Sequence, residues 1–186
     1  MTPIQDSKKF TLVNRPLLEL KVDAIVNPTN TDLLMGAGIG GQIRKLGGTD
    51  IQEDCLEIGS ISLGQTAVTN AGNLDVKYII HAAVMKIGGV TSEKNLIGCI
   101  QSVSRRINEY KISRIAVPPM GTGVGRFPLR RCAEVMIENI LTEVIKRRCL
   151  RQVIVAVEDE EEFRVFETVY SRIVSGTKGR AEIPSE

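Results

Sequence analysis

The chain has 186 residues, of which 42% are hydrophobic and 25% charged, the composition of a soluble globular protein with one sizeable core. Its 24 Lys and Arg residues against 22 Asp and Glu give a formal net charge of +2. That charge is too small for a dedicated duplex-binding surface, so nucleic acid is not the expected partner. No apolar run approaches the ~20 residues of a membrane span, and the N-terminus lacks a signal-peptide pattern. We expect a cytoplasmic protein with no membrane partner.

One domain is expected over residues 1–174, because no internal linker or repeat interrupts the pattern. Residues 175–186 are small, polar and contain Gly and Pro, which predicts a flexible C-terminal tail. The four cysteines, Cys55, Cys99, Cys132 and Cys149, stand far apart with no CxxC pair and no histidine nearby. They indicate neither a metal site nor a disulfide framework, and we predict that they are reduced and mostly buried.

Short apolar runs alternate with longer segments of helical period along the chain. The runs are mostly rich in Val and Ile without clean polar alternation, as expected for strands that are covered on both faces. Strands are predicted at Phe10–Val13, Ala24–Asn27, Thr66–Asn70, Tyr78–Ala83, Arg114–Val117 and Gln152–Val157. The alternation is typical of an α/β protein with a parallel or mixed sheet.

Several of the intervening helices have recognisable starts. Thr49 and Gln52 match the S/T-x-x-E/Q capping box, in which each side chain satisfies a free backbone amide of the first turn. Further starts are predicted at Ser92, at Pro128 as a first helical residue, and at Asp159, which pairs with Glu162.

Two glycine-rich loops, each between a predicted strand and a predicted helix, are the first candidates for chemistry. The first comprises Gly36, Ala37, Gly38, Ile39, Gly40 and Gly41, and the second comprises Gly121, Thr122, Gly123, Val124, Gly125 and Arg126. Backbone amides at a helix N-terminus make an anion site. The first loop matches GxGxxG, but it begins too far beyond its strand for a Rossmann site, and neither loop has the GK[ST] ending of a P-loop. The pair therefore predicts binding of a diphosphate without its cleavage.

A polar block, running from Asn27 to Asp32, follows one of the predicted strands. Open α/β sheets bind ligands at the carboxyl ends of their strands. The amides of Asn27 and Asn30 offer a donor and an acceptor together, which suits ribose hydroxyls. Turn chemistry alone also accounts for Asn, Pro and Asp here, so the sequence leaves both interpretations open.

Four blocks in order resemble the macrodomain, the ADP-ribose-binding module. They read VDAIVNPTNTDLLMGAGIGGQI, GQTAVTNAGNL, KYIIHAAV and VPPMGTGVGRFPL, and the resemblance extends roughly over residues 10–174. It implies a three-layer α/β/α sandwich on a mixed, mostly parallel six-stranded sheet. The pattern of strands and helices agrees with that expectation.

The resemblance also implies roles for the site residues. Asn30 would bind the distal ribose and orient water, and the first loop would wrap that ribose and the neighbouring phosphate. Thr122–Gly125 would hold the diphosphate from the other side, while Asn70 and His81 would support the cleft from its strands. The ligand is then ADP-ribose, with no required cofactor, and ADP-ribosylated proteins are the implied partners.

Three departures from the family pattern affect adenine binding and catalysis. Pro16 stands where an Asp usually reads the adenine amino group, which leaves only the backbone amide of Leu17 to contact the ring. Gly40 replaces the acid that many hydrolysing relatives place after the glycine run. Gly125 and Glu158 occupy positions that are often aromatic, and we expect a wider, wetter cleft at both.

The leading hypothesis is a protein that binds ADP-ribose or a close relative between the two glycine loops. Modest hydrolysis of ADP-ribosyl or O-acetyl-ADP-ribose esters is a further hypothesis. Against efficient catalysis stands the lack of any Asp, Glu or Cys between Leu33 and Leu46 to act as a general base. The alternative is a non-catalytic module for another nucleotide, a nucleic-acid end or a modified protein. Arg126, Arg130 and Arg131 would then extend the phosphate site, unless they are only a solvated basic face.

Overall fold

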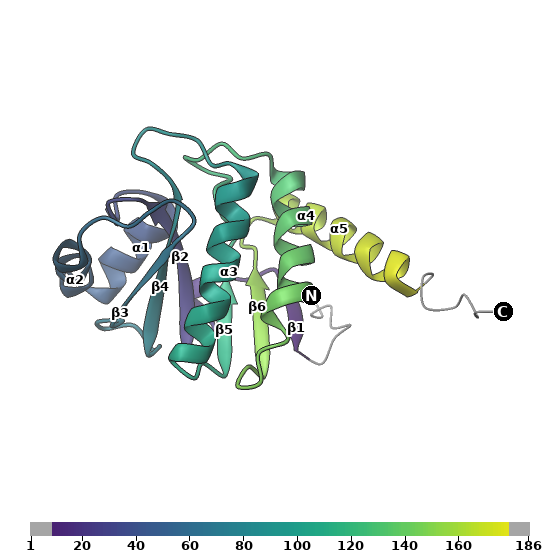
Figure 1. The fold of residues 1–186 in the computed structure, drawn as a ribbon, viewed down its shortest axis with the longest axis horizontal. Helices are drawn as coiled ribbons and strands as arrows, with labels where there is room; N and C mark the ends of the chain where they lie inside the picture. The colour runs from purple at the N-terminus through teal and green to yellow at the C-terminus, as the bar shows by residue number, and fades with distance from the viewer. Residues whose placement is uncertain (1–8, 179–186) are drawn as a thin grey trace.

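Six strands form one sheet in the order β1-β6-β5-β2-β4-β3 in the computed structural model, which describes residues 9–178 (Figure 1). Neighbouring strands pair in parallel except β3, which runs antiparallel to β4. The sheet is mixed and mostly parallel, so the predicted fold class is confirmed. The strands are β1 Phe10–Val13, β2 Ala24–Asn30, β3 Thr66–Thr69, β4 Tyr78–Met85, β5 Arg114–Val117 and β6 Gln152–Ala156.

Helices cover both faces of the sheet and make the two outer layers (Figure 1). One layer contains the 3-10 turn η1 Leu17–Glu19, α1 Gly38–Gly47 and α2 Asp50–Ile58. The other contains α3 Glu93–Glu109, α4 Leu129–Asn139 with its π-helical continuation η2 Ile140–Val144, and α5 Glu160–Lys178. None of the helices within residues 9–178 has both the length and the apolar character needed to cross a bilayer.

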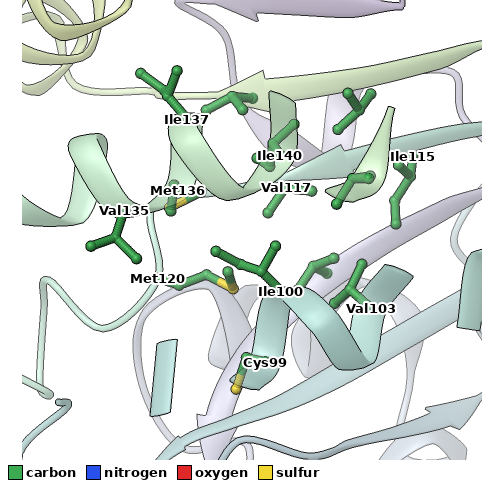
Figure 2. Close-up of a cluster of buried hydrophobic side chains, with 14 of the residues drawn as sticks. Cys99, Ile100, Val103, Ile115, Val117, Met120, Val135, Met136, Ile137 and Ile140 are labelled. Carbon is green, nitrogen blue, oxygen red and sulfur yellow. The ribbon is translucent and has the colours of Figure 1, made fainter. Parts of the chain in front are cut away.

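Successive strand residues face two different cores, because side chains alternate across a strand. In β2, Val26 belongs to the core under α3, α4 and α5, whereas Ile25 belongs to the core under α1 and α2. Figure 2 shows part of the larger core, where Ile100 of α3 and Met136 of α4 lie close to Val117 of β5. Both faces of the sheet are apolar, which explains why the strands lack polar alternation.

The cysteines behave as predicted in the described part of the chain. All four are free, three of them are buried, and Cys149 is half-buried. Burial raises the pKa of the Cys55 thiol to about 11 and that of Cys132 to about 12. These thiols are therefore protonated, inert core residues at neutral pH.

The predicted capping box at Thr49 is wrong. Thr49 precedes α2, but its backbone is helical and its side chain caps no amide. The Gln52 amide turns away from the helix instead, accepting a bond from the Met35 amide at 2.9 Å and donating to the Leu33 carbonyl at 3.3 Å. Gln52 thus fixes the segment that leads into the first glycine loop.

Several element boundaries also differ from the predictions. Strand β2 continues three residues past Asn27, because Pro28 and its neighbours still pair with β4. Pro128 is the residue before α4 rather than its first helical residue. Helix α5 runs to Lys178, four residues beyond the predicted domain limit at 174, and the rest of the predicted tail lies outside the described residues.

The sheet opens between β2 and β5. These neighbours pair only through Ala24 and Ile25, at the start of β2. The chain then leaves β2 toward α1 on one face and leaves β5 toward α4 on the other. Such a switch point leaves a crevice at the carboxyl ends of the strands, which is where open α/β sheets bind ligands.

Candidate ligand-binding cleft

A cleft of about 1020 Å³ occupies this crevice. Its walls include most of the predicted site: Leu17, Asn30, Gly36, Ala37, Gly38, Ile39, Gly40, Gly121, Thr122, Gly123, Val124 and Gly125. The two glycine loops, separated by 79 residues of sequence, therefore line one cavity.

The first loop is largely the opening turn of a helix. Helix α1 begins at Gly38, and Ala37 is its N-cap with no side-chain bond to the turn. None of the five amides from Gly36 to Gly40 has a hydrogen-bond acceptor among residues 9–178, and the first loop amide to find one is that of Gly41. These donors line the cleft and carry the positive end of the α1 dipole.

The second loop presents a similar set of donors. Its amides from Gly121 to Gly125 also have no acceptor in the described part of the chain. Gly121 has a φ of +84°, a left-handed conformation that favours glycine. The loop is closed at its base by the Phe127 amide, which donates to the Gly121 carbonyl at 2.9 Å.

Asn30 ends β2 at the rim of the cleft and holds the chain that follows it. Its Oδ1 accepts from the amides of Asp32 at 3.0 Å and Leu34 at 3.3 Å, and its Nδ2 donates to the Leu34 carbonyl at 3.1 Å. An amide group has two donor hydrogens, so one remains available in the cleft. Asn30 is therefore both a turn residue and a potential ligand donor. The two interpretations of the polar block, turn formation and ribose binding, are compatible at this residue.

Asn27 lies below the cleft rather than in its wall. It is fully buried, and its Nδ2 lies 3.1 Å from His81 Nδ1. Burial lowers the pKa of His81 to about 4, so the ring is neutral at pH 7. With Nδ1 accepting from Asn27, His81 Nε2 donates to Thr69 Oγ1 at 2.9 Å, and Thr69 donates to the Asn70 carbonyl at 2.8 Å. This chain of bonds fixes the orientation of the Asn27 amide.

Three other predicted residues do not reach the cavity. Gly41 faces back toward the Gly36 carbonyl, and Arg126 is exposed outside the wall. Asn70 binds the Gly72 amide and Asp54 at the far edge of the sheet. The predicted support of the cleft therefore comes from His81, through Asn27, and not from Asn70.

Two of the three arginines beside the second loop, Arg130 and Arg131, are already paired with carboxylates. Arg131 makes two bonds to Glu93 and one to Glu134, and Arg130 lies 4.0 Å from Glu134. Within residues 9–178, no Lys or Arg lines the cleft. Any anion in the cleft would thus be held by neutral backbone amides.

Carboxylates gather instead where α5 begins. Glu158, Asp159, Glu160 and Glu162 all line the cavity. Asp159 accepts from the Glu162 amide at 2.9 Å, which confirms the predicted helix start. Burial and the neighbouring Asp159 raise the pKa of Glu162. The resemblance places only Glu158 of this acidic run at the cleft, and the local sequence pattern indicates no more than a helix start for the other three. Their position in the cleft wall depends on the order of the strands in the sheet.

Exposed apolar side chains also line the cleft, and Leu34 and Ile87 among them were not predicted, whereas Val124 was. Leu34, Ile87 and Val124 are 44%, 60% and 62% exposed, and all three line the cavity. Gly88 has a positive φ and forms a turn directly after β4, beside Ile87. A glycine after a strand is visible in the sequence, so this part of the cleft wall could have been predicted from it.

The expected widening at Gly125 is wrong. A Cβ atom built on Gly125 would lie 2.2 Å from Thr91 Oγ1, so the Thr91 side chain fills the space that a larger residue would enter. Pro16 precedes η1 and offers no donor or acceptor side chain, while Leu17 lines the cleft beside it. Within residues 9–178 no group of three or more His, Cys, Asp or Glu is arranged to hold a metal ion.

Several known proteins are similar to this chain in sequence or in fold. Residues 26–136 match the family model described as Macro domain. A protein of Sulfurisphaera tokodaii is 33% identical over 171 residues, covering 90% of this chain and 93% of its own length. A macro domain-containing protein of Caldanaerobacter subterraneus is 31% identical over 173 residues, covering 89% of this chain and 98% of its own.

Two solved structures are similar in fold. The Oceanobacillus iheyensis macrodomain with ADP has a TM-score of 0.83 at 20% identity, covering 94% of this chain and 97% of that one. The Trypanosoma brucei macrodomain in complex with ADP-ribose has a TM-score of 0.78 at 23% identity, covering 86% and 68%.

Proposed function

The chain belongs to the Macro domain family, and from that premise we propose that its cleft binds ADP-ribose. The observation that carries the proposal is the pair of free amide rows, Gly36–Gly40 and Gly121–Gly125, in one cavity. Unpaired backbone donors at a helix N-terminus favour phosphate oxygens. The first row lies at the N-terminus of α1, and the second lies in the loop before α4. Two rows of free amides in one cavity suit a diphosphate, and Asn30 at the rim retains one donor hydrogen for a ribose hydroxyl.

We propose binding as the principal activity, with hydrolysis of ADP-ribosyl or O-acetyl-ADP-ribose esters much slower. Among residues 9–178, the acids in the cleft wall are the four at and just before the start of α5, whereas Asn30 lies at the end of β2. The family resemblance places Gly40 where many hydrolysing relatives have an acid. The nearby Asp32 is exposed and outside the wall. General acid–base catalysis contributes about 10²–10⁴ in rate, and Asn30 can orient water but cannot take its proton.

The test is calorimetric titration with ADP-ribose, ADP and AMP, followed by chromatography after incubation with an ADP-ribosylated peptide. We expect micromolar binding of ADP-ribose, weaker binding of AMP, and little released ADP-ribose. If none of the three nucleotides binds, ADP-ribose is not the ligand. Rapid release would contradict the proposal that hydrolysis is slow.

A second candidate is a module for another nucleotide, favoured by the lack of a side-chain base anchor at Pro16. The cleft keeps its phosphate donors in either case. GDP and CDP in the same titration separate the candidates, because a cleft without base selection binds the three nucleoside diphosphates about equally.

We expect Pro16→Asp to tighten ADP-ribose binding by about 1 kcal/mol, because a carboxylate makes a charge-assisted bond to the adenine amino group. Pro16 has φ −56° and ψ 134°, which an aspartate adopts without strain. The neutral Pro16→Asn variant is the matched control and should gain less. Equal affinity of both variants and the wild type would place the base away from this turn.

Binding should depend little on salt. The amide donors are neutral, and the four carboxylates at α5 repel a phosphate less as salt screens them. We expect the affinity for ADP-ribose to stay within about threefold between about 0.05 and 0.5 M NaCl. Arg126→Gln, outside the wall, should behave like the wild type. A tenfold loss in high salt that Arg126→Gln abolishes would instead show that the arginine holds phosphate.

A further inference from the structure

Two buried side-chain oxygens in residues 9–178 have no hydrogen-bond partner, and each lies behind one glycine loop. Asn27 Oδ1 lies 3.3 Å from the place where a Cβ on Gly40 would stand. Thr91 Oγ1 lies against the second loop, and Thr91 is 6% exposed. Buried polar atoms in native proteins almost always have a partner, so these two positions require an explanation.

Thr91 sits between the two ends of the second loop. Its backbone amide donates to the Gly125 carbonyl at 2.8 Å. Its Oγ1 would be only 2.5 Å from a Cβ on Gly121 and 2.2 Å from one on Gly125. Both glycines are therefore required by the Thr91 side chain, which packs against the loop and is not itself part of the cleft wall.

A valine would fill the same volume without burying a hydroxyl. Valine has the shape of threonine and an apolar methyl in place of Oγ1, so packing alone favours it in this pocket. The hydroxyl becomes useful only if the loop offers it a partner in some other state. The N–H and the C=O of one peptide plane point in opposite directions. A peptide that turns its N–H onto a phosphate therefore turns its carbonyl toward the side where Thr91 lies.

We propose that Thr91 is a positioning residue for ligand binding, and this rests on the proposed function. When a phosphate group binds in front of the second loop, the Thr91 hydroxyl donates to a loop carbonyl behind it. That bond holds the peptide with its N–H on the phosphate. The unpartnered oxygen of the ligand-free protein is satisfied in the complex, so the hydroxyl favours the bound state.

The test is Thr91→Val, measured by titration with ADP-ribose and ADP and by thermal unfolding without ligand. We expect both affinities to fall about three- to tenfold, because one hydrogen bond of the complex is lost. The unfolding temperature of the ligand-free variant should stay the same or rise, since no partner is lost and a buried hydroxyl is removed. Thr91→Ser keeps the hydroxyl and should bind within about twofold of the wild type.

Thr66→Val is the matched control, because Thr66 is a buried threonine whose hydroxyl already has partners. Its Oγ1 lies 2.8 Å from Ser102 Oγ and accepts from Arg106. This variant should unfold at a lower temperature and bind as the wild type does. Thr91→Val is thus expected to lose affinity and keep its stability, whereas Thr66→Val is expected to lose stability and keep its affinity.

Each outcome decides between the hypotheses. If the wild type binds neither nucleotide, the proposed function fails and the role of Thr91 fails with it. If the wild type binds and Thr91→Val binds equally well, only the role of Thr91 is overturned. If Thr91→Val and Thr91→Ser both lose affinity and stability together, the side chain serves packing alone, and the proposal is again overturned.

Discussion

Gly123→Val should weaken ADP-ribose binding at least about 100-fold, or about 2.7 kcal/mol, while the protein remains folded. Gly123 lines the cleft, and a Cβ built on it meets no protein atom within 4 Å. Its backbone is not left-handed, so valine causes no strain there. The new side chain occupies space in front of the loop, where a phosphate must approach the amides. Titration gives the affinity, and thermal unfolding should change by less than about 2 °C.

Gly125→Val is the contrasting variant in the same loop. Its Cβ would lie 2.2 Å from Thr91 Oγ1 and 2.7 Å from the Gly121 carbonyl oxygen. We therefore expect this variant to unfold at a clearly lower temperature, as overpacking costs about 1–3 kcal/mol. A Gly123→Val protein that folds and binds normally would remove the second loop from the ligand site.

The layered fold was predictable because the sequence patterns of its strands and of its helices are both local. Apolar runs and helical periods are read within ten residues, and the alternate residues of a strand such as β2 face cores on both sides of the sheet. A glycine-rich segment before a predicted helix likewise indicates backbone amides that have no acceptor within the helix. The two loops were therefore predicted from the sequence as anion sites, and the fold brings them into one cavity.

Features that depend on distant contacts were not predictable. Gln52 has the local pattern of a capping residue, yet its amide binds Leu33 and Met35, 19 and 17 residues away in the chain. Asn27 and Asn30 look alike in the NPTN block, but one is fully buried on His81 and the other lies at the cleft rim. Strand β2 continues through Pro28, so the block that resembles a turn is mostly strand.

The role of Asn30 can be resolved by comparing two ligands. We expect Asn30→Ala to weaken ADP-ribose binding by about 1–3 kcal/mol, through loss of a cleft donor and of the bonds that hold the following turn. Those bonds, to Asp32 and Leu34, also stabilise the free protein, so its unfolding free energy should fall by about 1 kcal/mol.

ADP has both phosphates of ADP-ribose but lacks the distal ribose, and so it separates the two effects of Asn30→Ala. If the free Nδ2 hydrogen binds a distal ribose hydroxyl, the variant loses affinity for ADP-ribose and keeps most of its affinity for ADP. If Asn30 acts only by holding the turn that leads to the first glycine loop, the phosphate donors are displaced for both ligands, and the two affinities fall together. Asn30 makes three hydrogen bonds within its own turn, so losing them can by itself lower the affinity for ADP-ribose. The loss of affinity for ADP-ribose therefore shows a contact with the distal ribose only where it exceeds the loss of affinity for ADP.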